Sequence, residues 1–411
     1  MKVSVEGVGP WPLGQDTVST PTSSVFQQPS RRDGPSPRLR RAYNVDIDAD
    51  GWVRMRDGVT QKLAGTAIAR GFYGGGVLLL QDGAGLYKVT EGEAYSTDEL
   101  ASGLSGADIE FHEWDFETVF WMDDGSTGMV YQGDAYPWGL TVPAAPLLSA
   151  QAGSLSAGTY RVVCTLEDAL GREHGATPVG EITISASQDI VVDLDSPDAS
   201  ATYANIYVSS GDNRESLLWC QRVAIGNLPA TVSDVRVSRA PCRTQYLRGP
   251  IPGNGVSEVN GYVLTWVDTF VFRSEGQTPH LFDPTNVMSF EHEVRAVAAP
   301  DNSGFYVATT GGLYWVATGT SEPKDWNATK INNKCYAKGF CVESTDRVSV
   351  SDADTKVVLL IDQDGLVACL PNAQVRHVTN RRMRVDTTNA TARFAYRDRG
   401  EGVNQLLIAI N

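Results

Sequence analysis

The sequence lacks the motifs that usually indicate a chemical function. Its six cysteines include no Cys-x-x-Cys pair, and its five histidines are scattered, with no His-Glu-x-x-His motif. Zinc sites need clustered Cys and His ligands. No Gly-x-Ser-x-Gly elbow or phosphate-binding loop is present either. We therefore expect a protein that is not an enzyme and that carries no cofactor.

Positive charge is also scarce. The chain has 34 Lys and Arg against 49 Asp and Glu, which gives a formal net charge of −15. Proteins that bind nucleic acid through its phosphates need a positive surface. An acidic wall instead repels DNA that passes along it. The composition argues against general nucleic-acid binding by charge attraction, but it allows a passage through which DNA slides.

Long apolar runs are absent as well. No stretch reaches the roughly 18 apolar residues of a membrane span. The first residues, MKVSVEGVGPWPLGQD, lack the apolar core of a signal peptide. We expect no membrane span, and we expect folding in a cytoplasm.

Short strands joined by Asp/Gly turns are what the sequence does contain. In Tyr43–Val59, apolar residues alternate with polar ones on both sides of an Asp-Ala-Asp-Gly turn, which predicts a β-hairpin. The same pattern recurs twice before residue 143 and four times after residue 260. The recurrences begin near Val77, Val119, Val263, Tyr306, Val358 and Phe394. Most of these spacings fall near the roughly 40–50 residues of a propeller blade.

The pattern is interrupted between residues 146 and 247. The short strands predicted there, in stretches that include Ala157–Pro178 and Tyr203–Ser210, are spaced as in a β-sandwich. The run GTYRV…IYVS resembles immunoglobulin-like or fibronectin-III-like modules. Cys164 and Cys220 are placed so that an inter-sheet disulfide could join them, but we expect buried reduced thiols, because no Trp lies at the expected place between them.

These patterns predict an all-β protein, a six-bladed β-propeller-like domain with an inserted β-sandwich and an extended N-terminal arm. The hairpin Tyr43–Val59 would pair with the last strand, Leu406–Ile410, and close the ring. Two separate open β domains flanking a sandwich are the alternative. The predicted division is an arm over 1–42, propeller parts over 43–145 and 248–411, and the sandwich over 146–247.

The arm holds the only basic cluster of this acidic chain. Its middle part is rich in Ser, Thr, Pro and Gln, without an apolar period. A solvated run of charges and a segment that docks on an acidic partner both fit this composition. The arginines are Arg31, Arg32, Arg38, Arg40 and Arg41.

A second candidate site lies in the first hairpin. Carboxylates at positions 1, 3 and 5, a Gly at 6 and an acid at 12 match the spacing of a calcium loop. An Asp/Gly-rich turn without a metal has the same composition. The residues concerned are Asp46, Asp48, Asp50, Gly51 and Asp57.

The remaining polar and aromatic residues give no catalytic set. Paired acids such as Asp115/Glu117 and Asp362/Asp364 occur in predicted turns, where Asp is favoured for local reasons. We expect the histidines at the surface. Among the tryptophans, Trp121, Trp266 and Trp315 are predicted to be core residues. Trp138, in the loop YPWGL, is predicted to be an exposed contact.

One stretch resembles a known family. Pro37–Gln61, PRLRRAYNVDIDADGWVRMRDGVTQ, resembles a segment in structural proteins of tailed bacteriophages, in which an arm leads into a similar motif. Met55 replaces an Arg of that motif, and Asp57 stands where Pro is common. The matching residues are Arg41, Ala42, Asn44, Val45, Asp46, Asp48, Gly51, Arg54, Arg56 and Gly58.

The repeats and the embedded sandwich also resemble the tail nozzle or tail-tube proteins of short-tailed phages. The resemblance implies a virion protein assembled in the host cytoplasm. It would form a homohexameric ring below the portal and adaptor, for DNA retention and ejection, without specific binding of the double-stranded DNA that passes. A carbohydrate-binding protein of host recognition is the competing function, and a propeller hydrolase is a third.

Overall fold

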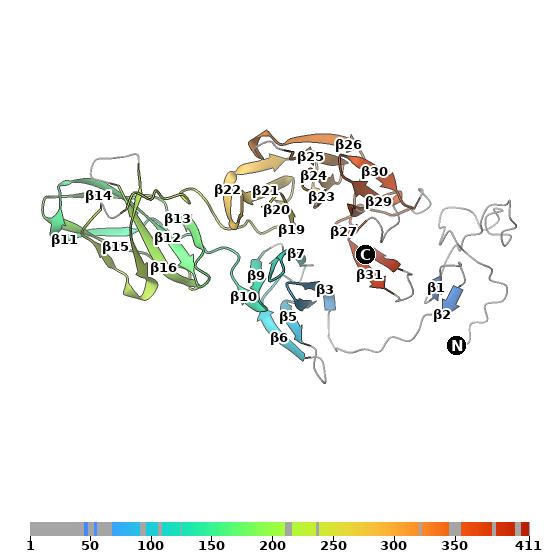
Figure 1. Cartoon of the computed structure of the whole chain (residues 1–411), viewed down its shortest axis with the longest axis horizontal. Helices are drawn as coiled ribbons and strands as arrows, with labels where there is room; N and C mark the ends of the chain where they lie inside the picture. The colour runs from blue at the N-terminus through green and yellow to red at the C-terminus, as the bar shows by residue number, and fades with distance from the viewer. Residues whose placement is uncertain are drawn as a thin grey trace. The chain divides into compact units, whose positions relative to one another are not determined.

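The computed structural model describes residues 45–47, 53–55, 68–90, 96–105, 109–123, 125–209, 216–235, 238–319, 323–344, 355–379, 384–398 and 404–410. Strands dominate these residues, and the helices among them are the short 3₁₀ turns η2 (Ile225–Asn227) and η3 (Pro323–Asp325). The prediction of an all-β, propeller-like chain is confirmed (Figure 1). None of the described residues forms a helix long and apolar enough to cross a membrane.

The chain divides into two compact units, of which one comprises residues 65–289. This unit contains three four-stranded antiparallel sheets, each with its strands in chain order. The first sheet is β3 (Ile68–Gly74), β4 (Val77–Asp82), β5 (Gly85–Thr90) and β6 (Ser96–Ala101). The second is β7 (Glu110–Asp115), β8 (Thr118–Met122), β9 (Thr127–Tyr131) and β10 (Asp134–Tyr136). The third is β19 (Gly255–Val259), β20 (Tyr262–Val267), β21 (Phe270–Glu275) and β22 (Thr278–Ser289).

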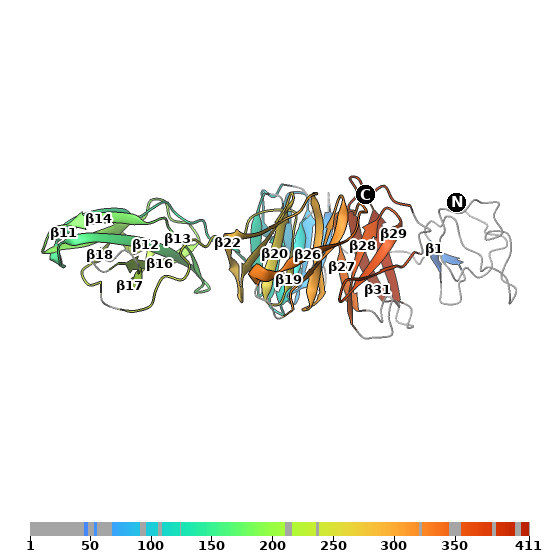
Figure 2. The ribbon, with the colours of Figure 1, turned by 90° about the horizontal axis from the view of Figure 1, so that it is seen from above.

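The predicted sandwich is inserted between the second and third of these sheets. One layer has the order β11-β15-β18, and the other has the order β13-β12-β16-β17, with β14 also paired to β12. Most of these strands are labelled in Figure 2. The strands are β11 (Leu147–Leu155), β12 (Gly158–Asp168), β13 (Glu173–Ala176), β14 (Gly180–Ile184), β15 (Gln188–Asp193), β16 (Ala201–Val208), β17 (Leu218–Ala224) and β18 (Ala230–Val232).

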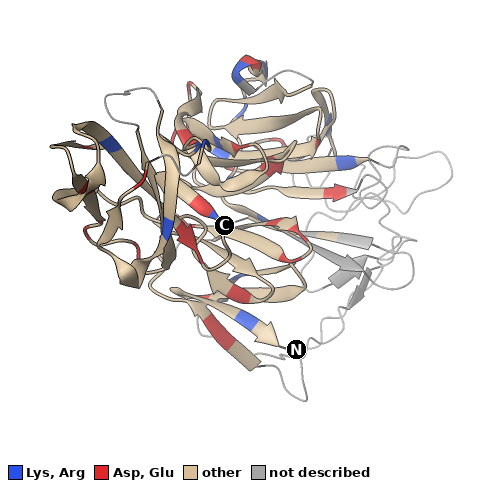
Figure 3. Ribbon diagram, turned by 60° about the vertical axis from the view of Figure 1, so that its left-hand side comes forward, with Lys and Arg blue, Asp and Glu red and all other residues tan. Residues whose placement is uncertain are grey.

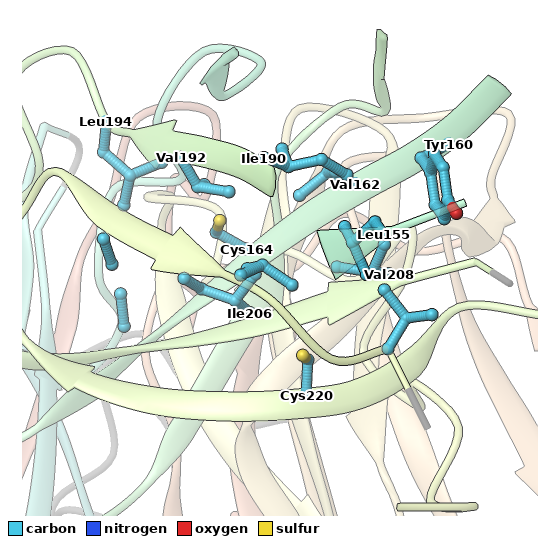
Figure 4. Packing of buried hydrophobic residues seen from close by; sticks show 14 of the residues in the cluster. Leu155, Tyr160, Val162, Cys164, Ile190, Val192, Leu194, Ile206, Val208 and Cys220 are labelled. Carbon is cyan, nitrogen blue, oxygen red and sulfur yellow. The ribbon is translucent and has the colours of Figure 1, made fainter. Parts of the chain in front are cut away.

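The core of the sandwich follows from the alternation of apolar residues along its strands. Val162 and Cys164 of β12, with Ile206 and Val208 of β16, point into one buried cluster (Figure 4). Cys220 belongs to the same cluster, and both it and Cys164 are free thiols, so the expectation of reduced cysteines here is met. Burial raises the pKa of Cys220 to about 11 and that of Cys164 to about 12, which keeps both sulfurs protonated and unreactive.

The other unit comprises residues 1–64 and 290–411. It contains two four-stranded sheets and two separate two-stranded ones. The first four-stranded sheet is β23 (Val294–Asp301), β24 (Gly304–Thr309), β25 (Gly312–Ala317) and β26 (Asn327–Asn332). The second is β27 (Cys341–Ser344), β28 (Lys356–Asp362), β29 (Gly365–Leu370) and β30 (Gln374–His377). The two-stranded sheets are β1 (Val45–Ile47) with β2 (Val53–Met55), and β31 (Ala392–Asp398) with β32 (Asn404–Ile410).

The sheet series matches the recurrences seen in the sequence. Two propeller-like sheets precede the sandwich and four follow it, the last of them with two strands. The pairings described for these strands are β1 with β2 and β31 with β32, and the predicted pairing of the first hairpin with the last strand is not among them. In two of the four-stranded sheets every residue of the second strand, β8 or β24, is buried.

Candidate functional site: an acidic rim with exposed aromatic residues

Three turns of the first two sheets meet at one rim. The backbone N–H of Gly75, in the β3–β4 turn, donates to Oε1 of Glu113 on β7 at 2.9 Å. Gly75 has a φ of +58°, and a Cβ there would lie 3.1 Å from the Val119 side chain. A side chain at this position would therefore be both strained and crowded. Because Gly75 has no side chain, the β3–β4 turn can approach β7 and β8 closely.

The β9–β10 turn joins the same rim. The Gln132 N–H donates to the Glu117 carbonyl oxygen at 2.9 Å, and its side-chain amide donates to Oε2 of Glu117 at 3.0 Å. The Lys88 ammonium donates to the Gly133 carbonyl at 2.9 Å. These bonds tie β5, the β7–β8 turn and the β9–β10 turn together, so the rim is a defined surface.

Large apolar side chains stand exposed on this rim. Phe116, at the tip of the β7–β8 turn, is 92% exposed, and Tyr73, at the end of β3, is 72% exposed. Tyr73 is paired in register with Leu78, which is 37% exposed. A single exposed apolar side chain is normal at a protein surface, whereas several of them on adjoining turns are informative. The arrangement favours contact with another molecule.

The charges around these rings are mostly acidic. Exposed carboxylates flank Phe116 on both sides, at Asp115 and Glu117, and the exposed Glu113 lies on the same strand. Lys88 lies 4.0 Å from Asp134. We define the acidic rim as Tyr73, Leu78, Glu113, Asp115, Phe116, Glu117 and Asp134. Its rings and carboxylates suit a partner that presents apolar and cationic groups.

A buried polar cluster lies at the end of strand β12 in the same unit. The carboxylate of Asp168 accepts from Arg172 Nε at 2.8 Å and from His174 Nε2 at 3.1 Å. His174 Nδ1 in turn accepts from the Leu140 N–H at 3.2 Å, so the Nε2 tautomer carries the proton. Burial by itself would raise the pKa of Asp168, but the bonds from His174 and Arg172 hold that pKa well below its usual range.

A second histidine adjoins this cluster. The rings of His174 and His280 lie 5.0 Å apart, edge to face, and His280 Nε2 donates to the Glu173 carbonyl at 3.1 Å. Burial, with His174 and Arg172 nearby, lowers the pKa of His280 to about 4. Both ring nitrogens of His174 are hydrogen-bonded within the protein, so the His174 imidazole is not free to accept a proton from a substrate. The arrangement ties backbone segments together, since Arg172 also donates to the Pro137 carbonyl at 2.8 Å.

The other unit holds a buried ionic cluster in the β28–β29 turn. Lys334 Nζ lies 2.9 Å from Oδ2 of Asp362 and 2.7 Å from Oδ2 of Asp364. Arg384 also pairs with Asp364, and His377 Nε2 lies 3.3 Å from the Lys334 ammonium. The Asp362 side chain is fully buried. Two carboxylates are thus balanced by two cations, which is the arrangement of a structural ion cluster.

The sequence-predicted sites fall largely outside the described residues. Asp46 lies on β1, while Asp48, Asp50 and Asp57 are outside them, as are all five arm residues Arg31, Arg32, Arg38, Arg40 and Arg41. Among the residues that are described, no group of three or more His, Cys, Asp or Glu is arranged to hold a metal ion.

Two predictions about single side chains are wrong. Trp138 is completely buried rather than exposed: its ring stacks on Phe120 with 4.5 Å between centroids, and its Nε1 donates to the Pro279 carbonyl at 2.8 Å. His174 and His280 are buried rather than at the surface. The core placement of Trp121, Trp266 and Trp315 is confirmed, since each is at most 7% exposed.

The residues of the acidic rim were not singled out as a site by the sequence analysis. The sequence pattern indicated for Asp115 and Glu117 only that they are acidic residues of a turn. The available signal was Phe116 between them, because a large aromatic residue at the tip of a two-strand turn has no local reason to be there.

Comparison with known proteins places the chain in no family. No protein-family model matches the sequence, and no curated protein matches it. Among solved structures, apo AztD from Citrobacter koseri is 12% identical, and the alignment covers 81% of this chain and 78% of AztD with a TM-score of 0.33. Kluyveromyces lactis Hsv2 is 10% identical over 84% of this chain and 98% of its own length, with a TM-score of 0.22. Similarities at this level assign no function.

Proposed function

We propose that this chain is a structural protein of a phage tail, which assembles as a ring of six copies around the DNA channel, below the portal and adaptor. The observation that carries the proposal is the acidic rim, a defined surface with exposed Tyr73 and Phe116. Rigid aromatic side chains ringed by polar groups are typical of contact surfaces between proteins. In this proposal the rim contacts a neighbouring subunit.

The charge of the chain suits a channel through which DNA moves. Each copy contributes a formal net charge of −15, so a ring of copies repels the phosphates of passing DNA. In the view of Figure 3, the ribbon positions of Lys and Arg are scattered among those of other residues over the described strands. The protein then needs no catalysis: subunit contacts hold the ring, and repulsion keeps DNA from adhering to it during ejection.

The buried polar clusters support a mechanical role. The hydrogen bonds of Asp168, Arg172 and His174 bind backbone at Leu140 and Pro137, and those of Lys334 join a loop to the β28–β29 turn. Such internal bonds fix segments in place and rigidify a fold when every member is satisfied. Rigidity is what a component that transmits pressure and guides DNA requires.

Localisation tests this proposal directly. Antibody against the purified chain, detected with gold particles in electron micrographs of intact virions, should label the tail below the connector. Labelling of fibres alone, or no labelling of the particle, would contradict the proposal.

Carbohydrate binding in host recognition is the second candidate function. One observation favours it: exposed rings on turns, Phe116 and also Tyr246, which is 70% exposed, could stack on sugar faces while neighbouring carboxylates accept hydroxyl hydrogen bonds. A glycan array probed with the wild-type chain and with Phe116→Ser separates the two functions. Binding that the substitution abolishes would replace the structural role by recognition.

A further inference from the structure

The sheet of β31 and β32 is half the size of the other sheets in the series. Its strands pair over their whole length, from Ala392 opposite Ile410 to Asp398 opposite Asn404. The other five sheets of the series have four strands each. Among the described strands, none pairs with the outer edge of β32.

The edge of β31 is already partly occupied. The Lys338 N–H donates to the Ala390 carbonyl at 2.9 Å, and the Ala392 N–H donates to the Lys338 carbonyl at 2.7 Å. Gly339 has a φ of +91°, and a Cβ at this position would lie 2.3 Å from the Ala392 carbonyl oxygen, so the two segments are in close contact. The edge available for a further strand is therefore that of β32.

The sequence of β32 is that of an inner strand. The second strands β8, β24 and β28 are apolar and buried, whereas the last strands β6 and β26 expose most of their side chains. β32 reads NQLLIAI, a mostly apolar strand without a charged residue. Yet Leu406, Ile408 and Ile410 pack only partly buried against the core of β28 and β29. An apolar edge strand can pair with other chains unless something covers it.

We propose that the hairpin β1–β2 of the same molecule pairs with β32 and completes this sheet in the order β31-β32-β1-β2. In the structure the two hairpins form separate sheets. The pairing of β32 with β1 would therefore be formed in addition to the pairings within each hairpin. This inference does not rest on the proposed function. The two hairpins together would form a four-stranded sheet, the size of the other sheets in the series. Each strand would lie beside the next one in the order, as in those sheets.

The chemistry of β1 and β2 suits these positions. β2 reads VRM, and a charged residue on the last strand protects a sheet edge. A last strand of this length has a precedent in β10, which also has 3 residues. A two-stranded hairpin alone is marginally stable in water, so β1–β2 gains most of its stability by pairing.

The connection that follows β2 has the length found between successive sheets. Residues 333–340 link β26 to β27, and residues 378–391 link β30 to β31. Residues 56–67, between β2 and β3, form a link longer than the first and shorter than the second. In the completed order, β2 would be followed along the chain by the first strand of another sheet, as β6, β22, β26 and β30 are.

Hydrogen exchange at single-residue resolution, by mass spectrometry of the full-length chain, tests the proposal. The amides of β32 that do not bond to β31 should exchange slowly, at rates that do not change with protein concentration. Exchange of these amides at the rate of an open edge would overturn the proposal. Protection that increases with concentration would also overturn it, because the added strands would then come from a second copy.

A pair of proline variants makes the test specific. Asp46→Pro breaks β1, which would become an inner strand, and should speed exchange of those β32 amides by ~10-fold or more. Val18→Pro, in the arm, is the matched control and should change nothing. The amides of β28 and β29 report whether the fold is intact. Unchanged β32 exchange in Asp46→Pro would overturn the proposal.

Discussion

The N–H of Gly75 lies 2.9 Å from the Glu113 carboxylate, and this bond holds the turn of one sheet against a strand of the next. The two residues are far enough apart in sequence that nothing local brings them together. Their contact builds the acidic rim, on which Tyr73 and Phe116 are exposed. A rim held in this way presents its rings in a fixed geometry, as a contact between subunits requires.

The first prediction concerns Phe116. Replacing this exposed ring by Ser in Phe116→Ser should leave the free energy of unfolding within about 0.5 kcal/mol of the wild-type value, since the ring packs against little. If the rim is a subunit contact, self-association should weaken by ~10-fold or more. Sedimentation velocity at several concentrations measures it. Tyr246→Ser, at another exposed ring, is the control and should assemble normally; equal loss in both variants would argue against a specific rim contact.

The second prediction concerns Trp138. Because its ring is fully buried on Phe120 and its Nε1 bonds to Pro279, Trp138→Ala should lower the free energy of unfolding by about 3–5 kcal/mol. Trp138→Phe keeps much of the packing and loses the donor, so it should cost less. Urea unfolding followed by fluorescence measures both variants. A loss within 0.5 kcal/mol for the alanine variant, about the effect of a surface site, would show that the ring is not in the core.

The third prediction concerns Lys334. Its ammonium balances the buried Asp362 carboxylate and Asp364, so Lys334→Met leaves an uncompensated charge and should destabilise the fold by about 3–5 kcal/mol. The double variant Lys334→Met with Asp362→Asn should recover a large part of that loss. Thermal unfolding of the wild type, both single variants and the double variant completes the cycle. Additive losses would show that the two residues do not interact.

The fourth prediction concerns pH. The pKa of His280 is lowered to about 4 in the folded chain, whereas an unfolded His titrates near 6.5. Between these values the unfolded chain binds the extra proton, so stability is lost as pH falls from about 6.5 to about 4. The depressed pKa of Asp168 adds a loss of the same sign below its unfolded value of 3.8.

The variant His280→Gln isolates the first of these contributions. Urea unfolding at pH 7 and at pH 5 should show a smaller drop in stability for His280→Gln than for the wild type. An equal drop in both would place the pH sensitivity elsewhere. His292→Gln, at a half-exposed histidine, is the control and should behave like the wild type.

The sequence predicted the strands well, because the pattern that defines them is local. Alternating apolar residues around Asp/Gly turns located the hairpins of Val77 and Val119 and identified Trp121 as a core residue. Trp138 was predicted wrongly for a physical reason. It follows a proline in a loop between strands, and its burial depends on Phe120, Phe282 and the Pro279 carbonyl, contacts that only the folded chain brings together.

The candidate site was less predictable than the fold. Tyr73 and Phe116 belong to different sheets, and their turns adjoin through tertiary contacts such as the bond between Gly75 and Glu113. The burial of His174 and His280 has the same origin, since their partners Leu140 and Glu173 are supplied by other segments. Single residues in turns carry no periodic signal from which such partners could be inferred.

Mass and shape of the assembled protein test the central claim most directly. Native mass spectrometry and negative-stain microscopy would be applied to the purified chain, alone and after mixing with the phage connector. The proposed function predicts a sixfold ring, either free or formed on the connector, with DNA passing without retention. A chain that stays monomeric under both conditions and is missing from purified tails would contradict it.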